Sequence, residues 1–119
     1  MDLKQIEEHW KTWAATFGSE IRATEKSKTR KALEIDALVR AIHKVGFKST
    51  DTFSVLEPGC GTGYNCLAIA EAFPNAQIFG FDYILEMIEN ARLLQSKTKF
   101  RNIHYAQGNL LDLSAVDLP

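Results

Sequence analysis

The sequence predicts an α/β domain in which helices flank a parallel sheet, with two further helices ahead of the first strand. Three short segments rich in β-branched and aromatic residues lie in the second half of the chain, at residues 52–57, 77–82 and 103–107. Helical patterns separate them, and strands that alternate with helices of this length join through right-handed crossovers into a parallel sheet. A chain of 119 residues that is 45% hydrophobic is expected to form one domain around one core.

The first predicted helix covers residues 3–17 and ends at Gly18. Its apolar residues recur at intervals of three and four, as on the buried face of an amphipathic helix. They are Leu3, Ile6, Trp10, Trp13, Ala14 and Phe17.

The second predicted helix begins after Ser27, whose hydroxyl group suits an N-cap, and ends at Gly46, a residue type favoured just past a helix end. Its buried stripe is expected to contain Ile35, Leu38, Val39, Ile42 and Val45.

The first predicted strand is the segment "TFSVLE", which is short and apolar enough to be buried on both faces. A glycine-rich loop follows it. The remaining elements are predicted as a helix at 65–73 stopped by Pro74, a strand at 77–82, a helix at 84–95 and a strand at 103–107.

The segment "GNLLDLSAVDLP" leaves the third strand without a following helix and a fourth strand. We therefore expect residues 1–119 to form a single domain truncated at its C-terminus, with a helical cap at 1–50 and a βαβαβ core at 51–119. The first strand would lie at an exposed edge of the sheet. That edge predicts either a longer enzyme or a homo-oligomer that pairs through it.

The charge balance gives no sign of a nucleic-acid or membrane partner, since 14 Lys and Arg residues face 15 Asp and Glu residues. The start "MDLKQIEEHW" is not a signal peptide, and no apolar run is long enough to span a membrane, so a cytoplasmic protein is expected. Cys60 and Cys66, with three scattered histidines, lack the spacing of a zinc site, and no metal is expected.

The chemistry is concentrated in "VLEPGCGTGYN", where Gly59, Gly61 and Gly63 follow a strand and open a helix. Ligands of open parallel sheets bind at the carboxyl ends of the strands. Side chains at the three glycines would hold a ligand away from the backbone or require a strained φ. Asp82 ends the next strand, at about the distance where an acid meets ribose hydroxyl groups.

Two ligand classes suit this pattern, a dinucleotide and S-adenosylmethionine. Glu57 would face a diphosphate, and two like charges about 5 Å apart repel by roughly 3 kcal/mol at an effective dielectric of about 20. Near a cationic ammonium or sulfonium group the sign reverses. Tyr64 stands where the dinucleotide pattern places its third glycine. Both residues favour S-adenosylmethionine.

These residues resemble the class I, Rossmann-like S-adenosylmethionine-dependent methyltransferases. "LEPGCGTG" matches the first family motif, an acid followed by Gly-x-Gly-x-Gly, while "GFDYILEMIENAR" and "AQGNLLDL" resemble the second and third. The resemblance covers roughly residues 52–113. It implies an incomplete Rossmann-like sheet of about three βα units.

The resemblance also implies roles for individual residues around the donor. Gly59, Gly61 and Gly63 would line the methionine portion, with Glu57 supporting its ammonium group. Asp82 would accept hydrogen bonds from both ribose hydroxyl groups.

Around the adenine, Tyr83 and Ile84 would pack on the ring, and Asn109 with the Leu110 backbone would contact its edge. The family usually has aspartate in place of Asn109, which alters the contact with the exocyclic amine, although an amide oxygen also accepts. The loop residues Cys60 and Thr62 complete the predicted site, with Cys60 as a small filler.

The implied function is methyl transfer from S-adenosylmethionine to a small-molecule acceptor, with no assignable catalytic residue. The alternatives are a non-catalytic, truncated S-adenosylmethionine-binding module and an NAD(P)-binding oxidoreductase fragment. In similar enzymes an N-terminal helix folds over the cofactor, so the helix at 3–17 could be a lid instead of core. A basic cluster could attract an anionic acceptor or form a solvated face; it contains Arg22, Lys26, Lys28, Arg30 and Lys31.

Overall fold

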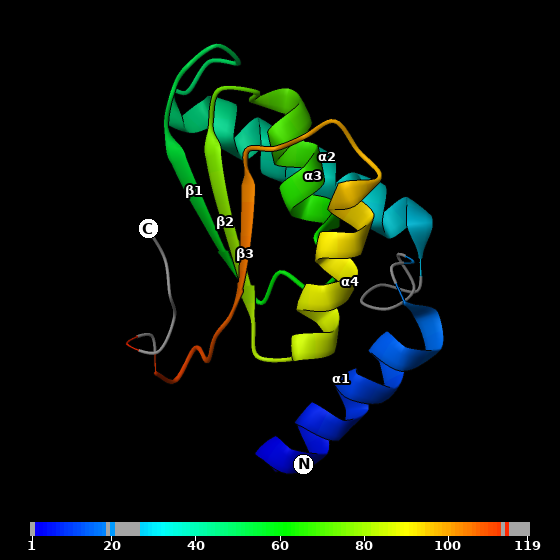
Figure 1. The fold of residues 1–119 in the computed structure, drawn as a ribbon. Helices are drawn as coiled ribbons and strands as arrows, with labels where there is room; N and C mark the ends of the chain where they lie inside the picture. The colour runs from blue at the N-terminus through cyan, green and yellow to red at the C-terminus, as the bar shows by residue number, and fades with distance from the viewer. Residues whose placement is uncertain (1, 19, 21–26, 113, 115–119) are drawn as a thin grey trace.

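The described part of the chain folds as a three-stranded parallel sheet with four helices, in the strand order β1-β2-β3 (Figure 1). The computed structural model describes residues 2–18, 20, 27–112 and 114. This architecture confirms the predicted α/β class. The elements are α1 (Leu3–Phe17), α2 (Lys28–Val45), β1 (Ser54–Pro58), α3 (Tyr64–Ala72), β2 (Gln77–Asp82), α4 (Leu85–Ser96) and β3 (Ile103–Gln107).

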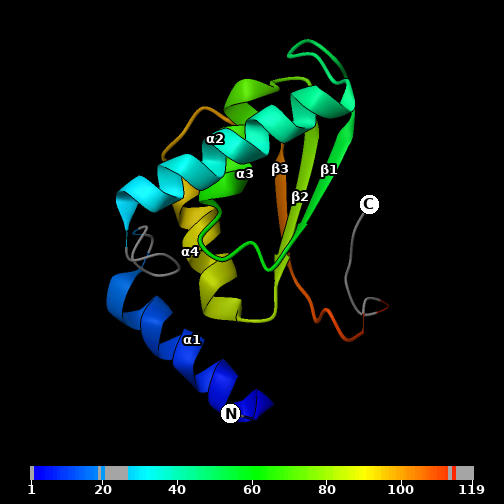
Figure 2. The same ribbon diagram turned by 180° about the vertical axis from the view of Figure 1, so that it is seen from behind.

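The sheet is covered on one face. Helices α2, α3 and α4 lie on the same side of the strands, with α2 crossing outside α3 (Figures 1 and 2). Side chains alternate accordingly: Ile78 and Ile103 face the helices and are buried, whereas Leu56 is 49% exposed and Phe79 stacks on the exposed His104.

The prediction that the first strand is buried on both faces is therefore wrong. In β1, Ser54, Leu56 and Pro58 are exposed, because no described helix covers that side of the sheet. The expectation that this strand lies at a sheet edge is confirmed, since β1 pairs only with β2 among the described strands.

The main core lies between the sheet and the helices, and Phe73 is near its centre with no exposed surface. Its ring packs edge-on against Phe53, with centroids 5.3 Å apart, and lies 4.7 Å from the ring of His43 on α2. Leu38 and Ile42 of α2 also pack on this core. Aromatic contacts of this kind dock α2 onto the α/β core.

The ends of α2 follow the sequence prediction. Ser27 Oγ accepts a hydrogen bond from Arg30 N at 3.1 Å, and Gly46 is the C-cap with φ of 122°. Val45, predicted to be buried, is instead 78% exposed.

Helix α1 packs on α4 through a second, smaller core. Ala14, Ile84 and Met87 are buried there, and Trp10, Trp13 and Phe17 pack around them. Asn90 Nδ2 also donates to Ala14 O at 3.3 Å. The predicted core packing of the aromatic stripe is thus confirmed, and it places α1 beside the carboxyl end of β2.

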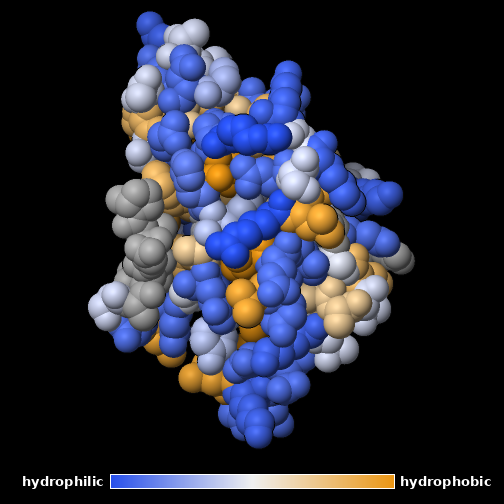
Figure 3. Space-filling view, viewed as in Figure 1, coloured by the Kyte–Doolittle hydropathy of each residue, from blue (hydrophilic) through white to orange (hydrophobic). Residues whose placement is uncertain are grey.

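On the surface seen in Figure 3, hydrophilic side chains predominate and apolar side chains form separate patches. None of the helices in the described ranges combines the length and the apolar character needed to cross a bilayer.

Candidate functional site

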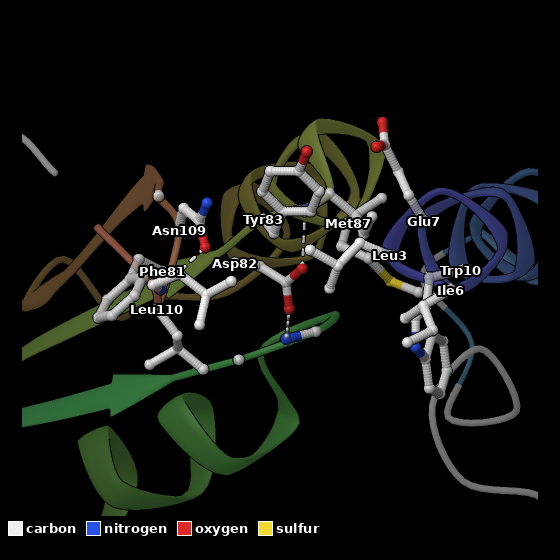
Figure 4. A pocket seen from close by; sticks show the side chains of 15 residues that line it. Leu3, Ile6, Glu7, Trp10, Phe81, Asp82, Tyr83, Met87, Asn109 and Leu110 are labelled. Atoms are coloured by element: carbon white, nitrogen blue, oxygen red, sulfur yellow. Dashed lines mark hydrogen bonds between the residues drawn. The ribbon is translucent and has the colours of Figure 1, made fainter. Parts of the chain in front are cut away.

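A cavity of about 470 Å³ opens at the carboxyl ends of β2 and β3, a volume typical of small-ligand sites (Figure 4). It is bounded by α1, the glycine loop, the start of α4 and the turn after β3. The described residues that line it are Leu3, Ile6, Glu7, Trp10, Gly59, Gly61, Phe81, Asp82, Tyr83, Ile84, Met87, Gly108, Asn109, Leu110 and Leu111.

The glycine loop forms one wall of this cavity. Gly59, Gly61 and Gly63 have φ of 67°, 56° and 85°, a region that residues with side chains rarely adopt. A Cβ atom at Gly59 would meet no atom within 4 Å, so the loop there presents bare backbone to open space. The structure thus shows both reasons that the sequence predicted for glycine: a positive φ at all three positions, and backbone at Gly59 that a ligand can approach closely.

The N–H groups of the loop are mostly used within the protein. Cys60 N donates to Phe81 O and Gly63 N to Cys60 O, each at 3.0 Å. Gly61 N donates to Asp82 Oδ2 at 2.9 Å. The loop is therefore held rigidly by its own hydrogen bonds, with few donors left for an anion.

Asp82 joins the loop to α4. Besides Gly61 N, its carboxylate accepts from Ile84 N, which contacts Oδ1 at 2.9 Å (Figure 4). Each oxygen has further lone pairs, and the carboxylate lies on the cavity wall. This arrangement places a fixed, ionic hydrogen-bond acceptor beside side-chain-free backbone.

The turn after β3 forms the opposite end of the cavity. Asn109 Oδ1 accepts from Leu111 N at 2.9 Å, and Gly108 N donates to Asp82 O at 2.9 Å. Leu110 is 59% exposed at the rim. Asn109 and Leu110 thus line the same cavity as Tyr83 and Ile84, and their contacts with an adenine stay a prediction.

Four predicted site residues do not line the cavity: Glu57, Cys60, Thr62 and Gly63. Cys60 is 7% exposed and packs in the core, as the filler role predicted, and burial raises the pKa of its thiol. Thr62 is 1% exposed, and its hydroxyl finds no hydrogen-bond partner in the part of the chain that the structure describes.

Glu57 faces the helix side of the sheet, where it lies near Asn65, Lys31 and Glu34. Burial raises the pKa of Glu57 to about 7, and the hydrogen bond from Asn65 and the charge of Lys31 offset only part of that effect. Lys31 is itself buried and lies 3.5 Å from Glu34. Glu57 therefore lies on the helix side of β1 and not on the described cavity wall.

The burial of the Glu57 carboxyl predicts that the free energy of unfolding depends on pH. The pKa of Glu57 is raised in the folded protein from 4.5 to about 7, so the carboxyl favours folding below pH 4.5 and this advantage is lost as pH rises toward 7. Relative to the wild type, the Glu57→Gln variant should gain about 2–3 kcal/mol of unfolding free energy between about pH 5 and 8. Urea unfolding of both proteins across this range measures the difference, and parallel curves would contradict the buried position.

Leu3, Ile6, Glu7 and Trp10 of α1 also line the cavity, although the sequence predicted their helix only as core or as a lid and gave none of them a role as a site residue. These residues close the end of the cavity opposite Asn109 and Leu110 (Figure 4). Met87 is 1% exposed in the small core and also reaches the cavity wall. The apolar stripe of α1 was the sequence signal for this contribution, because the same face of the helix packs on α4 and borders the cavity. Whether α1 moves as a lid stays a prediction.

The predicted basic cluster is only partly described, because Arg22 and Lys26 lie outside the described residues. Of the described members, Lys31 is buried beside Glu34. The charged side chains that line the cavity are Glu7 and Asp82, so the described wall is acidic.

Comparison with known proteins assigns the family. A family described as "Methyltransferase domain" matches residues 49–118, which include the sheet and the glycine loop. An uncharacterized protein of Rickettsia prowazekii is 35% identical over 63 residues, covering 53% of this chain and 25% of that protein. A second curated relative, from Synechocystis, is 30% identical over 56% of this chain and 13% of its own length.

Among solved structures, PKMT2 from Rickettsia typhi in complex with AdoHcy is 34% identical, with a TM-score of 0.50 over 56% of this chain and 13% of that chain. The N-terminal domain of EvdMO1, in the presence of SAH and D-fucose, matches 98% of this chain and 48% of that chain. Its TM-score of 0.59 at 19% identity shows a shared fold.

The chain thus spans a quarter or less of the curated relatives it matches. The family match nevertheless covers more than half of the chain and contains the glycine loop, Asp82 and the turn after β3, although not the α1 residues of the cavity wall. The chain belongs to the class I S-adenosylmethionine-dependent methyltransferase domain family, with a Rossmann-like fold that covers part of its homologues' chains.

Proposed function

We propose that this chain is the cofactor-binding part of a methyltransferase that transfers a methyl group from S-adenosylmethionine to a small-molecule acceptor. Asp82 would hold the ribose, the bare backbone at Gly59 and Gly61 would adjoin the methionine portion, and Asn109 with Leu110 would contact the adenine edge. The cofactor supplies a methyl group activated by its sulfonium.

The observation that carries this proposal is the placement of the Asp82 carboxylate. It is fixed by two backbone N–H groups, each 2.9 Å away, and it lies on the wall of a cavity large enough for an adenosyl ligand. A carboxylate with both oxygens held in place accepts hydrogen bonds from a pair of neighbouring hydroxyl groups at little entropic cost. A ribose offers such a pair.

Two features disfavour a dinucleotide in the same cavity. A diphosphate needs free backbone N–H groups at the loop, but those of Cys60, Gly61 and Gly63 already donate to protein oxygens. The charged side chains on the described wall, Glu7 and Asp82, are acidic and would repel it. Glu57 is mostly buried and is not on the described cavity wall, so its charge would not face the diphosphate directly.

The protein's own contribution to the reaction would be orientation. Methyl transfer is an in-line displacement, so holding the donor rigidly against the acceptor supplies much of the rate enhancement. The internally bonded glycine loop and the Asp82 carboxylate provide that rigidity at the donor side.

Calorimetric titration tests the proposed ligand. S-adenosylhomocysteine and S-adenosylmethionine are expected to bind the protein with measurable heat, whereas NAD⁺ at the same concentration should give none. Adenosine is expected to bind more weakly than S-adenosylhomocysteine, because it lacks the amino-acid portion. Binding of NAD⁺ without binding of either sulfur compound would overturn the proposal in favour of the oxidoreductase alternative.

A further inference from the structure

The side chain of Tyr105 lies beneath the glycine loop and contacts it from the core side. Tyr105 is 9% exposed, and its hydroxyl group donates to Gly63 O at 3.4 Å. The same carbonyl accepts from Leu67 N at 3.0 Å, a bond within the first turn of α3. The tyrosine thus contacts the residue where the loop becomes the helix, the N-cap of α3.

The strand between Tyr105 and the loop leaves room for this contact. Gly80 of β2 pairs with Tyr105 on one side and with Glu57 on the other. A Cβ atom at Gly80 would lie 3.1 Å from the sulfur atoms of both Cys60 and Cys66, tighter than ordinary packing allows. Because Gly80 has no side chain, Cys60 of the loop and Cys66 of α3 pack directly on β2, next to the position of Tyr105 on β3.

The contact with Gly63 is close enough to fix the position of the loop. A Cβ atom at Gly63 would overlap the Tyr105 hydroxyl oxygen and lie 2.9 Å from Cζ. By contrast, a Cβ atom at Gly59 meets nothing within 4 Å, since that part of the loop faces the cavity. The loop is therefore in contact with the core at its last residue, Gly63, and open to the cavity at its first, Gly59.

The hydroxyl group of Tyr105 remains a neutral hydrogen-bond donor. Burial raises the pKa of Tyr105, and the nearby groups Cys66, Cys60 and Glu57 act in the same direction. The contact is thus not expected to change with pH in the physiological range.

We propose that Tyr105 is a positioning residue for the methyl donor. By contacting Gly63 from the core side, it holds the glycine loop in the position at which Gly59 and Gly61 meet the amino-acid portion of the cofactor. This inference rests on the proposed function. It assigns Tyr105 to the loop and not to the ribose or adenine contacts, which belong to Asp82 and to the turn after β3.

The first test compares two ligands in Tyr105→Phe. Loss of the hydroxyl group should weaken S-adenosylhomocysteine about fivefold, the effect of roughly one hydrogen bond, and leave adenosine within about twofold of the wild type. His104→Ala, the neighbouring residue on the opposite face of the sheet, should leave both affinities unchanged. An equal loss for both ligands, or no loss for either, would overturn the positioning role. A wild type that binds neither ligand would instead refute the proposed function.

The second test needs no ligand and decides whether the tyrosine sets the loop position. Gly63→Ala should lower the folding equilibrium constant through both its positive φ and the overlap with the hydroxyl oxygen. In the Tyr105→Phe background that loss should be at least about fivefold smaller, because part of the overlap is gone.

Gly46→Ala is the matched control, since Gly46 also has a positive φ but no atom within 4 Å of its Cβ position. Its effect on urea unfolding should be the same in both backgrounds. Additive effects of Gly63→Ala and Tyr105→Phe would refute the inference. If Gly63→Ala does not fold, restored folding in the double variant supports it, and an unfolded double variant counts against it.

Discussion

Replacing Asp82 with alanine is expected to weaken binding of S-adenosylhomocysteine by at least about 100-fold, the largest effect of any single substitution in the cavity. Two charge-assisted hydrogen bonds to the ribose would be lost, each contributing about 1.5–3 kcal/mol. The substitution would also remove the two hydrogen bonds that the Asp82 carboxylate accepts from Gly61 N and Ile84 N. Calorimetric titration of the variant measures the change in affinity.

The control is Asp36→Ala, which removes an exposed carboxylate that pairs with Arg40 on α2, far from the cavity lining. It should bind the ligand as the wild type does. Circular dichroism of both variants establishes that the fold is retained. An Asp82→Ala protein that keeps the native fold and binds within about threefold of the wild type would show that the ribose does not lie on this carboxylate.

Replacing Phe73 with alanine is expected to lower the free energy of unfolding by about 3–5 kcal/mol, the largest stability effect we predict. Phe73 is fully buried where α3 ends, and it contacts both Phe53 and His43 of α2. The deletion would leave a cavity that neighbouring rings cannot fill without moving α2. Urea unfolding followed by circular dichroism provides the measurement.

Phe79→Ala makes the same chemical change on the uncovered face of the sheet. Phe79 is only half-buried there beside His104, so its replacement should cost less than about 1.5 kcal/mol. Equal losses at the two positions would mean that the helix side of the sheet is not the core. A Phe73→Ala protein that does not fold at all would agree with the prediction, and Phe73→Leu should then fold with a smaller loss.

The elements of the fold were largely predictable because local signals mark their ends. Ser27 caps the start of α2 with its hydroxyl group, and Gly46 ends the helix with a positive φ that the lack of a side chain allows. The strand at Gln77–Asp82 was predicted to the residue. The first strand was less predictable, since an apolar run does not reveal which of its faces is covered. Leu56 is exposed because α2, α3 and α4 all lie on one side of the sheet, a property of the topology and not of the strand.

The candidate site was predictable where its residues belong to the motifs. Gly59, Gly61, Asp82 and Asn109 all border the cavity. Glu57 does not, although only Pro58 separates it from the loop, because alternation along β1 turns its side chain toward α2 and Asn65.

The contribution of α1 could not have been derived from spacing. Leu3 and Trp10 are far from the motifs in sequence, and they reach the cavity only because Ala14 packs on Ile84 and Met87. A helix stripe shows which face is buried but not which element it packs against.

The most direct test of the central claim is a crystal structure of the protein with S-adenosylhomocysteine. The ribose hydroxyl groups should lie within hydrogen-bonding distance of the Asp82 carboxylate, with the amino-acid portion beside Gly59 and Gly61. Electron density for the ligand outside this cavity, or a diphosphate bound over the loop when NAD⁺ is supplied instead, would contradict the account.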